Sequence, residues 1–407
     1  MSGALPHLLL LALVALPLGT AQALDLTGRF SMLGTTARAG AGDIGYLDGE
    51  RQTLTADQQS LRLMLDGVEQ HGEWSLHLDT ARLHLDGYPG PGAHSSELFR
   101  YREWAGEWLD ESGERSSTRI GYALDRAFYR YRTDNLTMAL GRQPLDWGSG
   151  RFWQPLNVFG AFSPIELDTD FKPGIDALSV DWYPSAYSSL TAAYVPAPKE
   201  NEALEESIAV YYRRNMGMVS ELSLLAGSVL GNRVGGGAFE SAWKGMGWRV
   251  EGVYYHLEES DETALFWIAG IDHQFTNGTL LTAEWYHNSH GASREGEIGA
   301  TLNDPLVAYG LQPQLGRRVL GLSLARDLTP LLHGSYTLLV APLSDETDQQ
   351  HTSLLHQFNL TYSVSNESDL LLSCLIANGK GVSDVEEPRS EFGHLPASLS
   401  VRLRFYF

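Results

Sequence analysis

The sequence contains a single cysteine, Cys374, in 407 residues. One cysteine excludes an internal disulfide, a Cys-x-x-Cys-His haem attachment and a four-cysteine metal site. The sequence also lacks His-Glu-x-x-His, Gly-x-Ser-x-Gly and Gly-x-x-x-x-Gly-Lys, the motifs of zinc proteases, serine hydrolases and phosphate-binding loops. We therefore expect a protein that is not an enzyme and that holds neither a metal nor a cofactor.

Positive charge and long hydrophobic runs are also scarce. Lys and Arg number 29 against 50 Asp and Glu, which gives a formal net charge of -21. Because such a chain repels phosphates, we expect no nucleic-acid partner. No segment approaches the ~18 consecutive apolar residues that indicate a membrane-spanning helix.

The N-terminal segment has the pattern of a signal peptide. A short apolar run at 8–16 is followed by Pro17 and by the small-x-small site Ala21-Gln22-Ala23. No Lys or Arg precedes the run, which departs from the usual pattern. A membrane anchor is the weaker alternative, since the run is about half of what a bilayer needs. We predict an exported protein with a signal peptide over residues 1–23.

The C-terminal tract alternates strictly up to Phe407. Apolar residues occupy every second position, at Leu399, Val401, Leu403 and Phe405. This period of two predicts a strand with one apolar and one polar face. The tract resembles the final strand of Gram-negative outer-membrane β-barrels, in which a terminal phenylalanine is an assembly signal. The resemblance implies a location in the outer membrane, contact with its lipid and its assembly machinery, and Phe407 as the assembly signal.

Alternating segments recur along the rest of the chain. Eighteen have the length of a tilted membrane strand: 24–33, 58–68, 73–86, 119–132, 135–142, 175–183, 188–196, 207–214, 218–230, 236–244, 247–257, 263–275, 279–288, 317–327, 333–342, 353–365, 369–377 and 397–407. Segments 73–86 and 119–132 change parity midway, which indicates either a bulge or a segment drawn too long.

The connections between these segments alternate between short and long. Tight turns such as 133–134 and 276–278 are followed by long joins such as 87–118, 143–174 and 289–316. A transmembrane barrel has short turns on one side and long loops on the other, whereas a soluble sandwich has no such requirement. The 10 Trp and 18 Tyr would form aromatic girdles at the two lipid boundaries. We predict an all-β fold, a single closed antiparallel transmembrane β-barrel over residues 24–407 with 16–18 strands.

The polar parity of the strands belongs to the lumen of such a barrel, while Cys374 falls on the lipid-facing parity. The predicted pore lining includes eight arginines from the first four strands and the last: Arg29, Arg62, Arg82, Arg126, Arg130, Arg132, Arg402 and Arg404. Guanidinium groups hold carboxylates or phosphates bidentately, so an unpaired ladder would favour anions. The alternative is that these arginines pair with inward Asp25, Asp66, Asp79 and Asp86.

The join at 143–174 contains the densest local signal, WGSGRFWQPLN at 147–157. Its glycines and prolines exclude a continuous strand, yet its aromatic residues need burial, and the lumen offers it. It resembles the inward-folding loop that narrows general porins. The resemblance implies a constriction loop containing Trp147, Arg151, Phe152, Trp153, Glu166, Asp168 and Asp170. We expect Arg151 to oppose the three acids; the alternative is a loop packed on the external rim.

These features favour a porin-like channel for passive diffusion of small hydrophilic solutes or ions. Two other functions stay open: a barrel that sheathes a multihaem cytochrome in an electron conduit, and a polysaccharide export barrel. Acidic loops at 199–206, 258–262, 345–348 and 384–387 oppose the arginines in sign, so the charge of the transported ion is undecided. A homo-oligomer is a further possible assembly.

Overall fold

The computed structural model describes residues 23–46, 52–88, 95–113, 115–199, 201, 203–383 and 387–407. The predicted signal peptide lies outside these residues, apart from Ala23. The barrel strands are β1 (Ala23–Arg38), β2 (Thr53–Val68), β3 (Gly72–Asp86), β5 (Ser116–Arg132), β6 (Leu136–Gln143), β7 (Ile175–Ser185), β8 (Ser188–Val195), β9 (Ser207–Asn215), β10 (Glu221–Val229), β11 (Asn232–Trp243), β12 (Met246–Leu257), β13 (Glu262–Gln274), β14 (Leu280–Asn288), β15 (Arg318–Thr329), β16 (Leu332–Ser344), β17 (Gln350–Ser365), β18 (Ser368–Asn378) and β19 (Ala397–Tyr406).

The remaining elements lie in the connections. They are β4 (Ala105–Ser112), η1 (Ser95–Phe99), η2 (Glu295–Glu297), α2 (Ile298–Leu302) and α3 (Pro305–Ala308). None of the helices in the described residues is long and apolar enough to cross a membrane.

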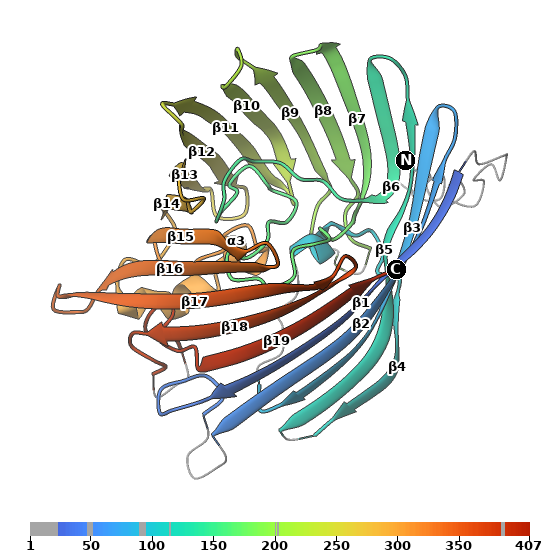
Figure 1. The fold of residues 1–407 in the computed structure, drawn as a ribbon. Helices are drawn as coiled ribbons and strands as arrows, with labels where there is room; N and C mark the ends of the chain where they lie inside the picture. Colours follow the sequence, from blue (N-terminus) through green and yellow to red (C-terminus); the bar gives the residue numbers. More distant parts are fainter. Residues whose placement is uncertain are drawn as a thin grey trace.

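Every strand is antiparallel to its neighbours, and β19 pairs with β1, so the sheet closes on itself (Figure 1). Nineteen strands form the sheet; β3 pairs directly with β5, so leaving out β4 gives a ring of eighteen. Closure pairs both edges of every strand of this ring and demands the even strand number that alternating loops predict. The predicted barrel is confirmed, at the upper end of the expected strand count.

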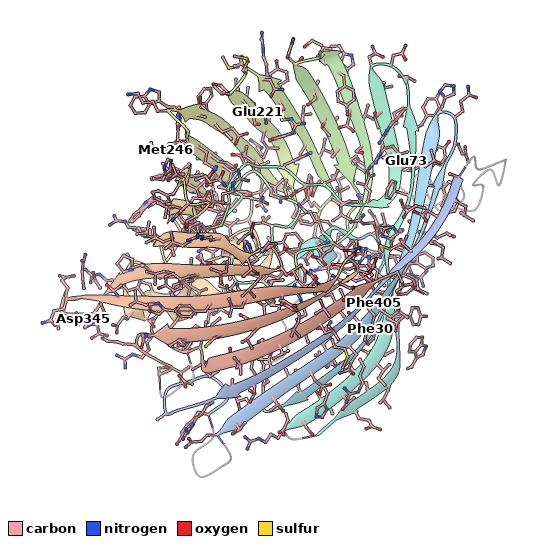
Figure 2. All side chains as sticks on the ribbon, viewed as in Figure 1. Phe30, Glu73, Glu221, Met246, Asp345 and Phe405 are labelled. Carbon is pink, nitrogen blue, oxygen red and sulfur yellow. The ribbon has the colours of Figure 1, made fainter. Side chains whose placement is uncertain are left out.

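The outward face is an apolar belt. Phe30 on β1 lies opposite Phe405 on β19, and Figure 2 labels both where the two strands meet. Large apolar side chains such as Leu370, Leu372 and Ile376 are exposed on this face, as an alternating lipid-facing pattern requires. Cys374 shares their parity on β18.

A bulge at Asp125 explains the parity change in the predicted segment 119–132. His77 pairs with Arg126 and Leu78 pairs with Leu124, so Asp125 has no partner on β3. An extra residue in one strand reverses the facing of the residues beyond it and redirects its own side chain. The bulge interpretation is therefore confirmed for 119–132, and Asp125 points into a polar network described below. For 73–86 it is wrong, because β3 pairs with β2 along its length without a register shift.

Two connections differ from the sequence expectation. Residues 87–118 were expected to be a plain loop, but they include β4, which extends the wall along β5 beyond the end of β6. The join between β10 and β11 lies on the long-loop side, yet it consists only of Leu230 and Gly231, with φ of 50° and 83°. Two consecutive residues with positive φ form the tight turn that suits a hairpin twist. Loops on that side are thus not all long.

Candidate pore constriction

The loop between β6 and β7, residues 144–174, crosses the space that the strands enclose (Figure 1). Its first half is held by two inward carboxylates, Glu251 on β12 and Glu284 on β14, which we call the acidic anchor. The backbone N–H groups of Arg151, Phe152 and Trp153 donate to Glu284 at 2.9, 2.7 and 3.2 Å.

Glu251 holds the loop in the same way on either side of this segment. The backbone N–H groups of Ser149 and Leu156 donate to its two carboxylate oxygens at 2.5 and 2.8 Å, and the Ser149 hydroxyl adds a third bond at 3.0 Å. Gly148 has φ of +99°, and a Cβ there would lie 2.7 Å from Glu251 Oε1, so a larger residue would collide with the anchor. The anchor carboxylates are 0% and 1% exposed.

Aromatic side chains of the same half pack on the inner wall. The Trp147 ring stacks on Tyr211 of β9 with a centroid separation of 5.1 Å, and Trp153 lies 5.0 Å from Tyr286 of β14. Phe152 and Trp153 are buried in one cluster with inward apolar residues of β12–β14. Burial of several large side chains contributes ~1.5–3 kcal/mol each, so this half is fixed by apolar packing as well as by hydrogen bonds.

The second half ends in a segment that we call the strap, residues 167–172. Arg29 on β1 bonds to Asp168 at 2.7 Å and to Asp170 at 2.9 Å. Arg404 on β19 also pairs with Asp170, and the Tyr406 hydroxyl donates to the same carboxylate. Paired carboxylates at a guanidinium form strong, charge-assisted hydrogen bonds.

The strap also offers backbone oxygens and an aromatic ring to the wall. Arg402 donates to the Leu167 carbonyl, and Arg126 donates to the Lys172 carbonyl at 3.4 Å. The Phe171 ring lies 4.3, 4.9 and 5.9 Å from three guanidinium carbons, which belong to Arg62, Arg29 and Arg126. Five arginines therefore surround the strap, and we call them the arginine wall: Arg29, Arg62, Arg126, Arg402 and Arg404.

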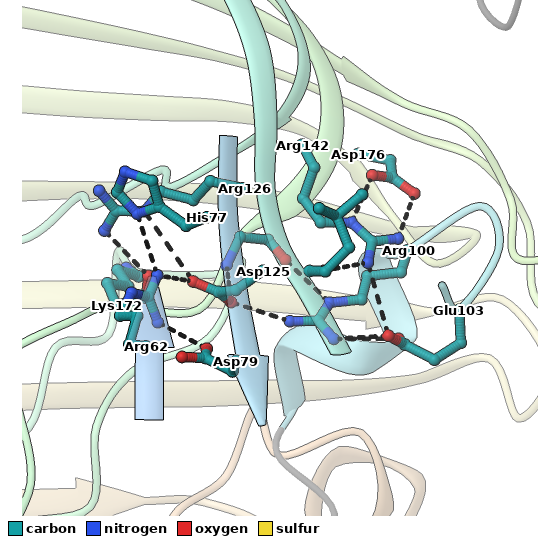
Figure 3. A network of polar contacts seen from close by, with 12 residues as sticks. Arg62, His77, Asp79, Arg100, Glu103, Asp125, Arg126, Arg142, Lys172 and Asp176 are labelled. Carbon is teal, nitrogen blue, oxygen red and sulfur yellow. Dashed lines mark hydrogen bonds and ion pairs between the residues drawn. The ribbon is translucent and has the colours of Figure 1, made fainter. Parts of the chain in front are cut away.

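A polar network connects this wall to the end of the loop (Figure 3). The bulged Asp125 pairs with Arg62 and with Arg100, and it accepts the backbone N–H of Gly174 at 3.1 Å. Arg142 forms a two-pronged pair with Asp176 at 2.8 and 2.9 Å. The ionic groups at the base of the loop thus have partners, as buried charges require.

The other predicted pore arginines have separate partners. Arg130 and Arg132 both pair with Glu73 on β3. The prediction that Arg82 lines the pore is wrong. The register places Arg82 on the same face as the outward Leu63 and Leu78, where it bonds to Gln59 and Asp57. The error arose because Ala81, Leu83 and Leu85 suggested that the odd positions face lipid, whereas β3 keeps its even positions outward throughout, as at Leu76 and Leu78.

The expected carboxylate partners also change. Asp79 does pair with Arg62 at 2.7 Å, but Asp66 contacts His77. The expected opposition of Arg151 to the acids of the loop does not form: Arg151 lies 3.6 Å from Asp272 and is 61% exposed. Asp168 and Asp170 face the arginine wall instead, and Glu166 closes a local turn by accepting from the Ser163 N–H.

Lys172 ties the strap to the first half of the loop. Its ammonium donates to Asp146 and to the Asn157 side-chain oxygen, both at 2.7 Å. Burial lowers the pKa of Lys172 to about 8, although the Asp146 carboxylate opposes this shift. Burial raises the pKa of Glu166, whereas the Tyr406 hydroxyl and the Arg404 guanidinium hold the pKa of Asp170 below its usual range.

Sequence reasoning missed the acidic anchor. A signal was present: segments 247–257 and 263–275 are apolar on both parities, at Val253 and Tyr255 inward as well as at Val250 and Tyr254 outward. A strand that is apolar on both faces is covered on both faces. An inward carboxylate among such apolar residues therefore indicates a position where a covering segment of the chain supplies the hydrogen-bond donors.

No protein-family model and no curated protein sequence matches the chain. Solved structures do match in fold. A BenF-like porin from Pseudomonas fluorescens Pf-5 has a TM-score of 0.59 at 9% identity, covering 96% of this chain and all of the other. OccAB4 of Acinetobacter baumannii gives 0.58 at 9% identity, covering 94% and 98%, and OccD3 (OpdP) of Pseudomonas aeruginosa gives 0.57 at 11% identity, covering 96% and 92%.

The chain has the fold of an outer-membrane porin. The match spans nearly the whole barrel, and the apolar belt of this porin barrel is the surface that lipid would cover. At about one residue in ten identical, the likeness concerns the fold alone.

Proposed function

We propose that this porin barrel is an outer-membrane channel for the passive diffusion of small hydrophilic solutes or ions, and that residues 143–174 set its bore. The observation that carries the proposal is the attachment of this loop to the inner wall at both halves, by the acidic anchor and by the arginine wall. A polar lumen narrowed by a fixed loop passes small solutes and rejects large ones.

A cavity on the short-turn side of the loop supports a hydrophilic cargo. It has a volume of about 340 Å³, and its lining includes Arg132, Asp181, Ser189, Thr191 and Arg213. Charged groups of both signs and hydroxyl groups line this space, so it suits hydrated solutes rather than apolar ones.

The sheath for a multihaem cytochrome receives less support, because the chain's own loop occupies the interior and Phe99 of η1 packs against its Phe159 at 5.2 Å. No contact in the described residues favours polysaccharide export over diffusion. The carboxylates around the loop favour a structural role over an enzymatic one, since Glu251 and Glu284 of the strands hold the loop backbone and Asp168 and Asp170 of the loop hold arginines.

Reconstitution tests the proposal. We expect discrete single-channel currents in planar bilayers, and swelling of liposomes that slows as the neutral sugar outside becomes larger. Liposomes containing protein that was denatured by boiling serve as the control. A folded, heat-modifiable protein that produces neither currents nor swelling would contradict the channel and would favour a sheath.

A further inference from the structure

The strap presents the arginine wall with the same chemistry that an anionic solute would present. Two carboxylates, from Asp168 and Asp170, bind guanidinium groups that come from opposite ends of the chain, Arg29 and Arg404. A phenolic hydroxyl completes the site on Asp170. The wall is therefore an anion-binding surface that is already occupied, by a segment of the chain itself.

The wall depends on this occupant to different degrees. Arg62 has two strand partners, Asp79 and Asp125, and Arg404 has Asp369 at 2.9 Å. For Arg29, which is 8% exposed, Asp168 and Asp170 are the only carboxylates within ion-pair distance among the described residues. A buried guanidinium left without a counter-ion is strongly unfavourable. The strap can thus leave this site at low cost only if another anion takes its place.

The strap is also the more loosely attached part of the loop. Its carboxylates are about a quarter to a third exposed, whereas the anchored residues Phe152 and Trp153 are below a tenth. Glu251 and Glu284 hold backbone groups only as far as Leu156. Beyond Lys172, the backbone is fixed again at Gly174 by Asp125. Phe159 on one side and Lys172 on the other are also held, by the buried cluster and by Asp146, so the part that can exchange partners is the short stretch that carries Asp168 and Asp170.

We propose that residues 167–172 are a displaceable internal counter-ion: Asp168 and Asp170 neutralise Arg29 and Arg404 of the arginine wall, and an anionic solute binds these two guanidinium groups by displacing the two carboxylates. The inference rests on the proposed channel function and adds a control of its selectivity. In the resting barrel the strap carboxylates mask Arg29 and Arg404, so the pore is less anion-selective than its arginines alone would make it.

The test compares two charge removals within the same loop. Asp168→Asn/Asp170→Asn unmasks the wall, whereas Glu166→Gln removes a carboxylate that accepts from Ser163 and has no arginine partner in the described residues. In a KCl gradient we expect the chloride-to-potassium permeability ratio to rise by about twofold per neutralised strap carboxylate, and to stay near the wild-type value in the control. An unchanged ratio in the double variant, or an equal rise in Glu166→Gln, would overturn the proposal.

A second measurement uses the unaltered protein and needs no conduction. Malonate, a small dicarboxylate, is added at constant ionic strength against a chloride reference, and amide hydrogen exchange is followed. We expect faster exchange in 167–172 and no change in 149–156. Equal exchange with both salts would show that the strap is a fixed tie and would refute displacement. Currents from the wild-type protein test the channel separately: a conducting barrel with an immobile strap keeps the proposed function and loses this inference.

Discussion

The two halves of residues 144–174 are attached to opposite kinds of wall. The first half gives backbone N–H groups to Glu251 and Glu284, both buried, and packs its aromatic rings around them. The second half gives carboxylates to Arg29 and Arg404, at partly exposed sites. Ion pairs that water reaches are weakened by salt, whereas buried hydrogen bonds among apolar side chains are not. One loop thus combines a permanent attachment with an adjustable one.

Removing both attachments has the largest expected effect. Deleting 146–170 should raise single-channel conductance severalfold, because the lumen loses its narrowing segment. It should also lower the temperature at which the barrel unfolds on gels, since inward apolar residues such as Val253 and Ile268 become exposed. Conductance equal to that of the wild-type protein would place the bore elsewhere.

Breaking only the buried attachment is the next largest change. Glu284→Ala leaves three loop N–H groups without their acceptor, and each unsatisfied buried donor costs ~1–3 kcal/mol. We expect a lower unfolding temperature and noisier open-channel currents. Glu240→Ala is the matched control, because Glu240 is an inward carboxylate of β11 that makes no hydrogen bond to the described loop residues. Equal effects of the two substitutions would contradict the anchoring role.

Salt should separate the two halves without any substitution. Raising KCl from 0.1 M to 1 M shortens the screening length from ~10 Å to ~3 Å. We expect amide exchange to quicken at 167–172 and to stay constant at 149–156. If both segments respond equally, the contrast between the attachments is wrong.

The smallest effect concerns Lys172, which joins the halves. Burial lowers its pKa to about 8, so the ammonium is charged at pH 7 and neutral at pH 9. Raising the pH through this range removes one positive charge next to Asp146, and the reversal potential should shift toward cation selectivity with a midpoint at about pH 8. The Lys172→Met variant should show, at pH 7 and at pH 9, the ion selectivity that the wild-type protein has at pH 9. A Lys172→Met variant that keeps the midpoint would assign the titration to another group.

The strands and the inward loop could be predicted because their signals are local. Alternation within ten residues identifies a strand, and an aromatic, turn-rich loop needs burial wherever it lies. The strand β4 escaped because its eight residues are largely exposed and alternate weakly. Arg82 was misplaced because Ala81, Leu83 and Leu85 are apolar yet lie on the inward parity of β3, which the pattern of a single segment does not reveal.

The pairing of charges could not be predicted for a different reason. Arg29 and Asp168 are 139 residues apart, and they meet only once the barrel has closed and the loop has folded inward. Any of the lumenal carboxylates had the right chemistry for any of the arginines. Which pairs form is decided by the three-dimensional course of 144–174, and one sequence carries little information about that course.

The acidic anchor holds main-chain groups, and this leaves one side chain unusually free. Glu284 accepts the N–H of Arg151, while the Arg151 side chain extends into the lumen beside Asp272 and is mostly exposed. Every amino acid except proline supplies the same N–H. The side chain at position 151 can therefore be changed by substitution, or by coupling a reagent to an introduced cysteine, while the hydrogen bond that holds the loop backbone to Glu284 is kept.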